Sequence, residues 1–252
     1  MNKGKLYLVP APLDFGCEQI APIQDVMPLQ TLQIAARLGC FICENAKSTR
    51  AYLKRVGEVT PLGQPVQALH IQELPREVHK KGDHAGNFDA RPMLKTALEG
   101  HDIGLVSEAG MPAIADPGSS VVRAAHDLGL EVIALTGPMS LMLALASSGL
   151  NGQNFAFVGY LPQDSGERSV RIKALESLAL KTGQTQIFIE TPYRNATLLQ
   201  ALLQILQGNT RLAISCGLTL DAAWNKSATL ARWKQDKPAP PLGLPTVFSI
   251  GR

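Results

Sequence analysis

"VSEAGMPAIADPG" (residues 106–118) is the stretch of this sequence that decides the fold. The apolar run "DIGL" (102–105) leads into it, and "SSVVRAAHDLG" (119–129), which has helical spacing, follows it. A connection between a strand and a helix needs only about two to six residues. This one is longer and acidic, and its prolines fix its shape. It predicts a rigid, functional loop at the end of a buried strand.

Short apolar strands alternate with helical stretches on both sides of this loop. "KLYLVPAP" (5–12), "CFICEN" (40–45) and "EVIALTG" (131–137) are typical strands, and helices are expected over 26–38 and after 45. Such alternation predicts an α/β fold with a mainly parallel sheet. We also predict a third strand in "VQALHI" (66–71), a polar loop over 73–88, and Asp116 as a cap or turn residue before the next helix.

The pattern of apolar and polar residues changes near Thr136–Gly137, where we place a domain boundary. Residues 1–136 form the predicted N-terminal α/β domain and residues 137–252 a C-terminal α/β domain. The second domain contains strands at "NFAFVGYLP" (154–162), "TQIFIETPYRN" (185–195), "RLAISCGLT" (211–219) and "PTVFSIG" (245–251).

Composition narrows the class of protein. The 252 residues are 45% hydrophobic and carry a net charge of +3, which is too small to indicate nucleic-acid binding by itself. No long apolar core follows the first lysines, and Gly137-Pro138 interrupts the most apolar region, so we expect no signal peptide, no membrane span and a cytoplasmic protein. Cys40 and Cys43 lie three apart on a strand and face opposite ways, so we expect no metal site.

Familiar ligand motifs are missing from the sequence. "VPAPLD" stands where a dinucleotide-binding protein has its glycine-rich turn, and the sequence has neither a P-loop nor a G-x-S-x-G elbow. The remaining candidates are loops that follow strands, the edge of an α/β sheet where ligands bind. Proline- and glycine-rich loops of this kind favour an adenosine-containing ligand held largely by main chain.

The order of "LYLVPAP", "CEN", "LVSEAGMPAIADPG", "LTGPMS", "GYLP" and "IFIETPYR" resembles the tetrapyrrole methylase-like family of methyltransferases that use S-adenosyl-L-methionine (AdoMet). Within it, the chain resembles the RsmI-type branch, which methylates a cytidine ribose 2′-hydroxyl of small-subunit rRNA. The resemblance implies a two-domain α/β fold with a parallel N-terminal and a mixed C-terminal sheet. It also implies a homodimer, AdoMet in the cleft between the domains, and rRNA or the ribosomal subunit as partner.

The resemblance also implies which residues contact AdoMet. In the N-terminal domain these are Pro10, Pro12, Leu13, Ser107, Ala109, Gly110, Met111 and Ile114. In the C-terminal domain they are Met139, Ser140, Glu190, Thr191, Gly217 and Leu218.

Three carboxylates are candidates for the base that a ribose hydroxyl needs, because each follows a strand at the ligand edge: Glu44, Glu108 and Glu190. Each can instead order its loop through hydrogen bonds. Candidate RNA contacts are Lys47, Arg50 and Lys54, which share one helix face, and Tyr193 with Arg194. The three basic residues can equally form an ordinary solvated face, and Tyr193 with Arg194 can equally fix the end of their strand.

The chain departs from the RsmI pattern at polar positions. Asn45-Ala46-Lys47 stands where that branch has D-T-R, Cys216-Gly217-Leu218-Thr219 replaces R-E-L-T, and Tyr193 replaces a histidine. Leu244-Pro245 replaces a G-E pair before the last strand. These departures leave two alternatives open: a methyltransferase acting on a small molecule such as a tetrapyrrole-like metabolite, and a non-catalytic protein that binds AdoMet or RNA.

Overall fold

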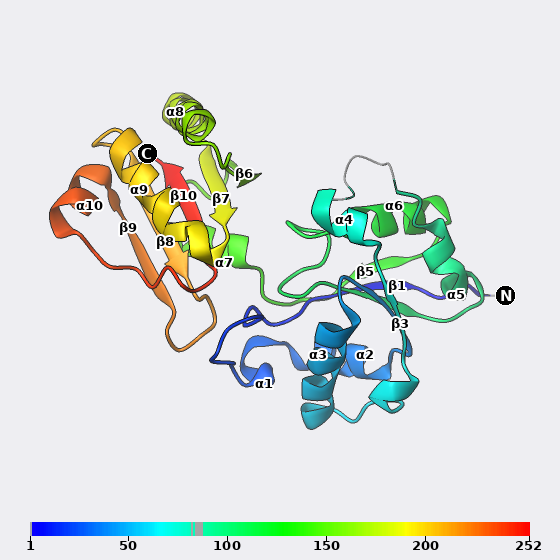
Figure 1. Cartoon of the computed structure of the whole chain (residues 1–252). Helices are drawn as coiled ribbons and strands as arrows, with labels where there is room; N and C mark the ends of the chain where they lie inside the picture. The colour runs from blue at the N-terminus through cyan, green and yellow to red at the C-terminus, as the bar shows by residue number, and fades with distance from the viewer. Residues whose placement is uncertain (1, 82, 84–87) are drawn as a thin grey trace. The chain divides into compact units, whose positions relative to one another are not determined.

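The computed structural model describes residues 2–81, 83 and 88–252. The chain forms two compact units, each with a five-stranded sheet (Figure 1). The first unit comprises the residues up to Gly16 with Ile20–Pro138, and the second comprises Cys17–Gln19 with Met139–Arg252. In the part of the chain that is described, no helix is long and apolar enough to cross a membrane.

The first unit is an α/β unit whose sheet has the strand order β3-β2-β4-β1-β5, and every neighbouring pair is parallel. This confirms the predicted fold class. Its elements are β1 (Leu6–Val9), α1 (Ile23–Val26), α2 (Leu29–Arg37), β2 (Cys40–Cys43), α3 (Ala46–Val59), η1 (Val66–Ala68), β3 (His70–Glu73), α4 (Arg76–Lys81), η2 (Arg91–Leu94), α5 (Lys95–Leu98), β4 (Ile103–Val106), α6 (Ser119–Asp127) and β5 (Val132–Ala134).

Helices cover both faces of this sheet, so its central strands are apolar throughout. Tyr7 and Phe41 pack with α1, α2 and α3, whereas Leu6, Ile42 and Leu105 pack on the opposite side with α4, η2, α5 and α6. All parallel strands end at one edge, which brings the loops after β1, β2 and β4 together.

Three local predictions for the first unit were wrong in detail. The helix expected over 26–38 is split into α1 and α2 by Met27 and Pro28, since proline has no N–H to continue a helix. The third strand begins at His70, after a 3₁₀ turn over Val66–Ala68. The predicted loop over 73–88 begins with the end of β3 and the helix α4, and its residues 82 and 84–87 lie outside the described residues.

The second unit contains a mixed sheet with the order β6-β7-β10-β8-β9, as the resemblance implied. Strands β6 and β7 are parallel, whereas the other neighbouring pairs are antiparallel. Its elements are α7 (Ser140–Ser148), β6 (Phe155–Tyr160), α8 (Ser165–Thr182), β7 (Thr185–Glu190), η3 (Pro192–Arg194), α9 (Asn195–Ile205), β8 (Arg211–Cys216), β9 (Trp224–Thr229), α10 (Leu230–Asp236) and β10 (Thr246–Gly251).

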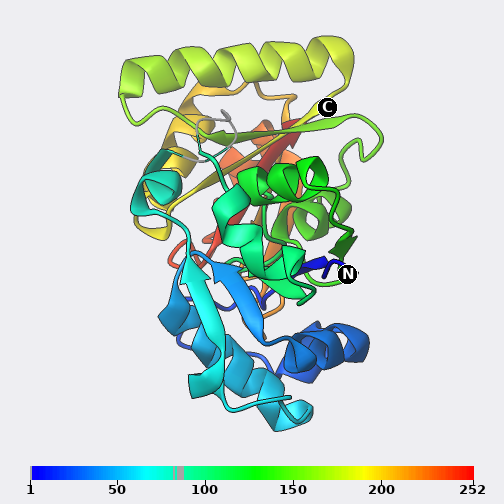
Figure 2. The ribbon, with the colours of Figure 1, turned by 90° about the vertical axis from the view of Figure 1, so that its right-hand side faces the viewer.

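The mixed sheet has a different helix layer on each face. Residues of α8, α9 and α10 pack on one face around Phe188 and Phe248, and the long helix α8 is seen in full length in Figure 2. Helix α7 covers the other face through Leu141 and Leu145, which pack against Ile187. Strand β9 and helix α10 were not predicted, because "WNKSAT" is polar and lies at the sheet edge.

Candidate functional site: the loops at the strand ends

The loop of residues 106–118, which we call the acidic loop, has a strongly constrained backbone. Ala113 and Ala115 both have φ of 65°, a left-handed conformation that costs energy for a residue with a side chain. The buried Ser107 hydroxyl donates within the loop to the carbonyls of Ala109 (3.2 Å) and Gly110 (3.3 Å). Such strain persists only where the surrounding structure enforces it, and it is concentrated at ligand sites.

The acidic loop is joined to the loop after β1. Ala11 and Gly110 exchange two backbone hydrogen bonds of 2.9 Å. A Cβ on Gly110, whose φ is 72°, would lie 3.2 Å from Leu13 and 3.5 Å from the Pro138 carbonyl oxygen. Gly137 in turn packs so closely on Pro10 that no side chain fits there. Three chain segments therefore meet at this edge of the first unit, and they carry most of the AdoMet contacts predicted there.

Asp83 anchors the far end of the acidic loop. Its carboxylate accepts hydrogen bonds from the Gly118 and Ser120 amides (3.0 and 2.9 Å) and from the Ser119 and Ser120 hydroxyls (2.8 and 2.5 Å). Although burial opposes it, this set of hydrogen bonds lowers the pKa of Asp83. Asp83 therefore caps α6. Of the two roles predicted for Asp116, cap or turn residue, the capping role is wrong, and Asp116 lies in the bend before α6.

Asp116 instead belongs to a group of three carboxylates, which we call the acidic cluster: Glu44, Glu108 and Asp116. The Glu108 amide donates to Glu44 (3.3 Å), and Ser48 on α3 donates to the Glu108 carboxylate (3.2 Å). Burial, followed by repulsion from Glu44 and Glu108, raises the pKa of Asp116 to about 7. Two of the three predicted base candidates are thus brought together, beside a third carboxyl that exchanges its proton near neutral pH.

A buried ion pair ties the loop after β1 to α3. Arg55 binds Asp14 through both guanidinium nitrogens (3.0 and 2.8 Å) and also donates to the Ala21 carbonyl (2.8 Å). The Asp14 side chain is only 5% exposed, so removal of Arg55 would leave this carboxylate buried without its ion-pair partner.

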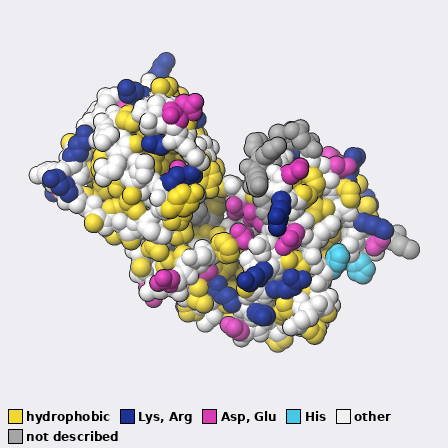
Figure 3. All heavy atoms as spheres, in the orientation of Figure 1, with side chains coloured by type: hydrophobic (Ala, Val, Ile, Leu, Met, Phe, Trp, Pro, Cys, Tyr) yellow, Lys and Arg dark blue, Asp and Glu magenta, His cyan; other side chains and the backbone are white. Residues whose placement is uncertain are grey.

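The predicted basic face is present on α3. Asn45 caps this helix by accepting from the amides of Lys47 and Ser48. Lys47, Arg50 and Lys54 are all exposed, and Lys and Arg side chains gather over this helix in Figure 3.

In the second unit, the predicted residues gather at one edge of the mixed sheet. Thr246 of β10 pairs with Glu190 of β7 on one side and with Cys216 of β8 on the other, so both strands end there. Met139 and Leu218 pack on the same apolar cluster, under α7. Gly217, with φ of 58°, leaves no room for a side chain beside Leu244.

Glu190 is engaged in holding its own loop. Its carboxylate accepts from the Thr191 amide (2.7 Å) and from the Arg194 guanidinium (2.9 and 2.7 Å). Its side chain is 5% exposed, and the hydrogen bonds that it accepts all come from the turn that follows β7. This geometry favours the loop-ordering alternative for Glu190 over direct proton transfer.

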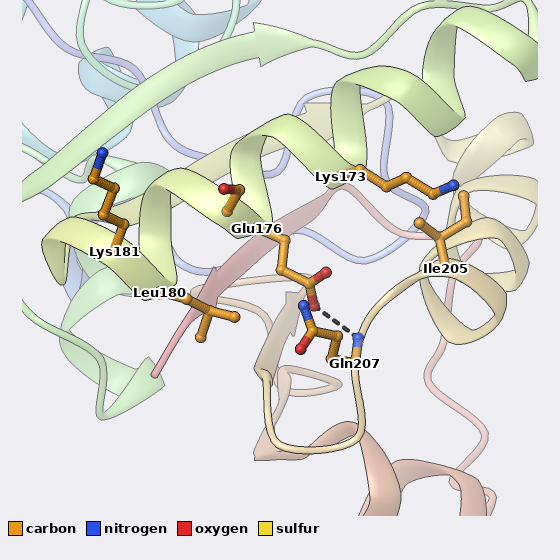
Figure 4. A pocket seen from close by; sticks show the side chains of 7 residues that line it. Lys173, Glu176, Leu180, Lys181, Ile205 and Gln207 are labelled. Carbon is orange, nitrogen blue, oxygen red and sulfur yellow. Dashed lines mark hydrogen bonds between the residues drawn. The ribbon is translucent and has the colours of Figure 1, made fainter.

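A cavity of about 630 Å³ in the second unit lies between α8 and the end of α9 (Figure 4). Glu176 lines this cavity. It accepts hydrogen bonds from the Gln207 amide (2.7 Å) and the Thr210 hydroxyl (2.5 Å), and these bonds fix the turn after α9. Lys173 and Lys181 on its rim point away from Glu176. The cavity contains none of the predicted site residues, and Glu176 serves the fold.

The fold is of the α/β class, and the loops predicted to bind a ligand follow its strands. The model of the family described as tetrapyrrole (corrin/porphyrin) methylases matches residues 25–229. The chain belongs to this family and is a methyltransferase of the AdoMet-dependent type.

Relatives of known name cover most of the chain. Ribosomal RNA small subunit methyltransferase I of Mesorhizobium japonicum is 32% identical over 89% of this chain and 67% of the relative. The protein of that name in Halalkalibacterium halodurans is 32% identical over 86% of this chain and 65% of the relative, so the chain spans about two thirds of their length. Among solved structures, the methyltransferase CobJ (19% identity, 99% of this chain and 94% of that chain, TM-score 0.56) and uroporphyrin-III-C-methyltransferase of Thermus thermophilus (17%, 99% and 94%, 0.52) share the fold.

Two residues of this site were missed by sequence reasoning. Asp83 lies 35 residues before Gly118, whose amide donates to it. The polar stretch around Asp83 gives no indication that it caps a distant helix. Asp116 was assigned to the turn because Asp-Pro-Gly is a common turn sequence. The sequence did contain one signal for the raised pKa of Asp116: this acidic loop and other carboxylates all follow strands, so like charges are expected to lie close together.

Proposed function

We propose that this chain transfers a methyl group from AdoMet to a ribose 2′-hydroxyl of small-subunit rRNA. The substrate rests on the name of relatives that are 32% identical over most of the chain. The observation that carries the chemistry is the acidic cluster, in which Glu108 and Asp116 lie on the strained acidic loop and Glu44 follows β2. A carboxyl group whose pKa is about 7 is suited to accept a hydroxyl proton at neutral pH.

The strand-end loops of the first unit fit an adenosine-containing methyl donor. Gly110 and Gly137 keep the backbone free of side chains where Leu13, Pro10 and the Pro138 carbonyl approach. A bound AdoMet would supply an electrophilic methyl on a sulfonium, so the protein has mainly to orient the two reactants. We assign the contacts with the methyl donor to the residues predicted above. Those of the first unit lie between Pro10 and Ile114, and those of the second unit lie between Met139 and Leu218.

Proton acceptance falls to the acidic cluster in this proposal. Asp116 joins Glu44 and Glu108 as a base candidate, whereas Glu190 orders its loop through Arg194. The exposed Lys47, Arg50 and Lys54 on α3 would contact RNA phosphates. From the resemblance, we also propose that the protein is a cytoplasmic homodimer. Light scattering would measure the mass of the dimer.

The test offers purified protein methyl-labelled AdoMet with ribosomal small subunits from a strain that lacks this gene, and a small-molecule extract in parallel. We expect label in rRNA at one ribose. The variant D116N should lower the rate by about 10²-fold or more if this carboxyl is the base, whereas D221N at an exposed position should not. Label in the extract alone would move the acceptor to small molecules. Binding of AdoMet without transfer to either would favour the non-catalytic alternative.

A further inference from the structure

Two tyrosines are exposed where β6 and β7 end. Tyr160 is the last residue of β6 and is 57% exposed, and Tyr193 lies in the 3₁₀ turn after β7 and is 79% exposed. Both strands are parallel, so both rings stand at the same edge of the sheet. Exposed aromatic side chains that gather at one place mark a binding surface more often than single apolar residues do.

A β-bulge decides which face Tyr160 occupies. Phe157 pairs with Ile187 and Tyr160 with Ile189, so β6 advances three residues while β7 advances two. Gly159, with φ of 72° and no atom within 4 Å of an added Cβ, sits inside this irregularity. Bulges of this kind redirect side chains beside functional sites.

The redirection moves Tyr160 away from the core. Side chains alternate along a strand, and Val158 packs on the face covered by α8 and α9, so a regular strand would place Tyr160 there too. Its pairing with Ile189, which packs under α7, puts Tyr160 on the opposite face. The bulge therefore presents an aromatic ring that a regular strand would bury.

Arginine side chains complete this surface. Arg194 is held by Glu190 and lies 5.3 Å from the centroid of the Tyr193 ring. The pKa of Arg194 is raised chiefly by its hydrogen bond to Glu190 and, to a smaller extent, by Tyr193 and Tyr160, which places all three side chains in one neighbourhood. Arg168 donates to the Gln163 carbonyl (2.9 Å) and so fixes the turn that follows Tyr160.

We propose that Tyr160 and Tyr193 form a stacking platform for an unpaired base of single-stranded RNA, with Arg194 held beside Tyr193 to face the base or its phosphate. Proteins bind unpaired bases by stacking them on aromatic rings and guanidinium planes, while arginines contact the backbone. A base inside a duplex presents no free face to such a platform. The proposal rests on the proposed function for its substrate class, which is RNA. It adds that the RNA is bound as a single strand with an unpaired base.

The experiment measures binding of the full chain to a fluorescent single-stranded RNA of roughly ten nucleotides. The comparison ligands are the same strand with abasic riboses and the matching duplex. We expect the base-bearing single strand to bind best, and Y160A and Y193A each to weaken that binding about 5- to 100-fold. The variants Y160F and Y193F should retain binding because the ring is kept. F155A alters an exposed ring at the other end of β6 and should have no effect.

Equal binding of the abasic and base-bearing strands would overturn the platform, and so would wild-type affinity in the alanine variants. Absence of any RNA binding by the wild type would overturn it as well. If the alanine variants instead change only the mass seen by light scattering, the surface joins two copies of the chain and the proposal is wrong. If the tyrosines are needed for base-dependent RNA binding but no label is transferred to rRNA, the proposed function is contradicted and the stacking platform is not.

Discussion

Asp116 shows how a single residue takes its chemistry from its surroundings. Burial, with the charges of Glu44 and Glu108, raises its pKa to about 7. Asp83, which comes from an earlier segment and anchors the end of the same loop, has a lowered pKa because amides and hydroxyls donate to it. The sequence identifies both residues only as acids in polar or turn-forming stretches. Their partners come from other elements, so neither pKa shift could be predicted without the fold.

The raised pKa of Asp116 predicts a specific pH dependence of stability. Between about pH 4 and pH 7 the folded protein keeps a proton that the unfolded chain has lost, so the free energy of unfolding falls as pH rises through this window. Each pKa unit corresponds to about 1.4 kcal/mol, so the loss amounts to up to about 4 kcal/mol. The variant D116N should lack it and should be more stable than the wild type at pH 8.

Urea denaturation at pH 5 and pH 8 checks this prediction. D221N, at an exposed position, is the control and should follow the wild type. If D116N and the wild type lose the same stability between the two pH values, Asp116 does not hold its proton in the folded state.

Asp83 should matter more than an ordinary helix cap. D83A would leave buried amides and hydroxyls without their acceptor, and we expect a loss of about 2–4 kcal/mol in the free energy of unfolding. D164A removes the exposed cap of α8, which accepts one amide, and should cost about 1 kcal/mol. Urea midpoints compare the two, and equal losses would contradict an anchoring role for Asp83.

At the scale of elements, prediction succeeded where the pattern was local. The apolar runs of β2 and β4 were sufficient to place these strands. It failed at the polar edge strand β9, where tertiary packing decides. It also failed at the bulge that changes the face of Tyr160, because the isolated Gly159 in the strand was not interpreted as a bulge. The predicted site residues keep their assignments as predictions. The AdoMet contacts rest on the resemblance, whereas the base and RNA candidates rest on their positions at strand ends and on one helix face.

The ion pair of Arg55 with Asp14 links α3 to the loop after β1. R55M would leave the Asp14 carboxylate buried without its counter-charge, and we expect about 3–5 kcal/mol of destabilisation. The matched control is R91M, since Arg91 and Asp89 form an exposed pair that solvent screens, so this variant should change stability little. Chemical denaturation distinguishes them. Similar midpoints for R55M and R91M would show that the Arg55 pair contributes no more than a surface one.

At the scale of the whole molecule, each unit has its own sheet and its own hydrophobic core. The parallel class of the first sheet follows from continuous apolar strands alternating with helices, a pattern visible in the sequence. The mixed order of the second sheet came only from the family resemblance, because strand polarity leaves no periodic signal when strands are joined by long connections. The cleft for AdoMet between the domains remains a prediction of that resemblance.

Separate cores predict that the second unit folds by itself. The fragment 139–252 keeps the apolar clusters around Phe188 and under α7, and it lacks only residues 17–19 of its unit. We expect helical and strand circular dichroism and one cooperative urea transition for this fragment. By contrast, AdoMet binding measured by calorimetry should require the full chain, because the proposed contacts come from both units. A fragment that unfolds without cooperativity would show that the second core depends on the first unit, and AdoMet binding by the fragment alone would contradict a site shared by the two.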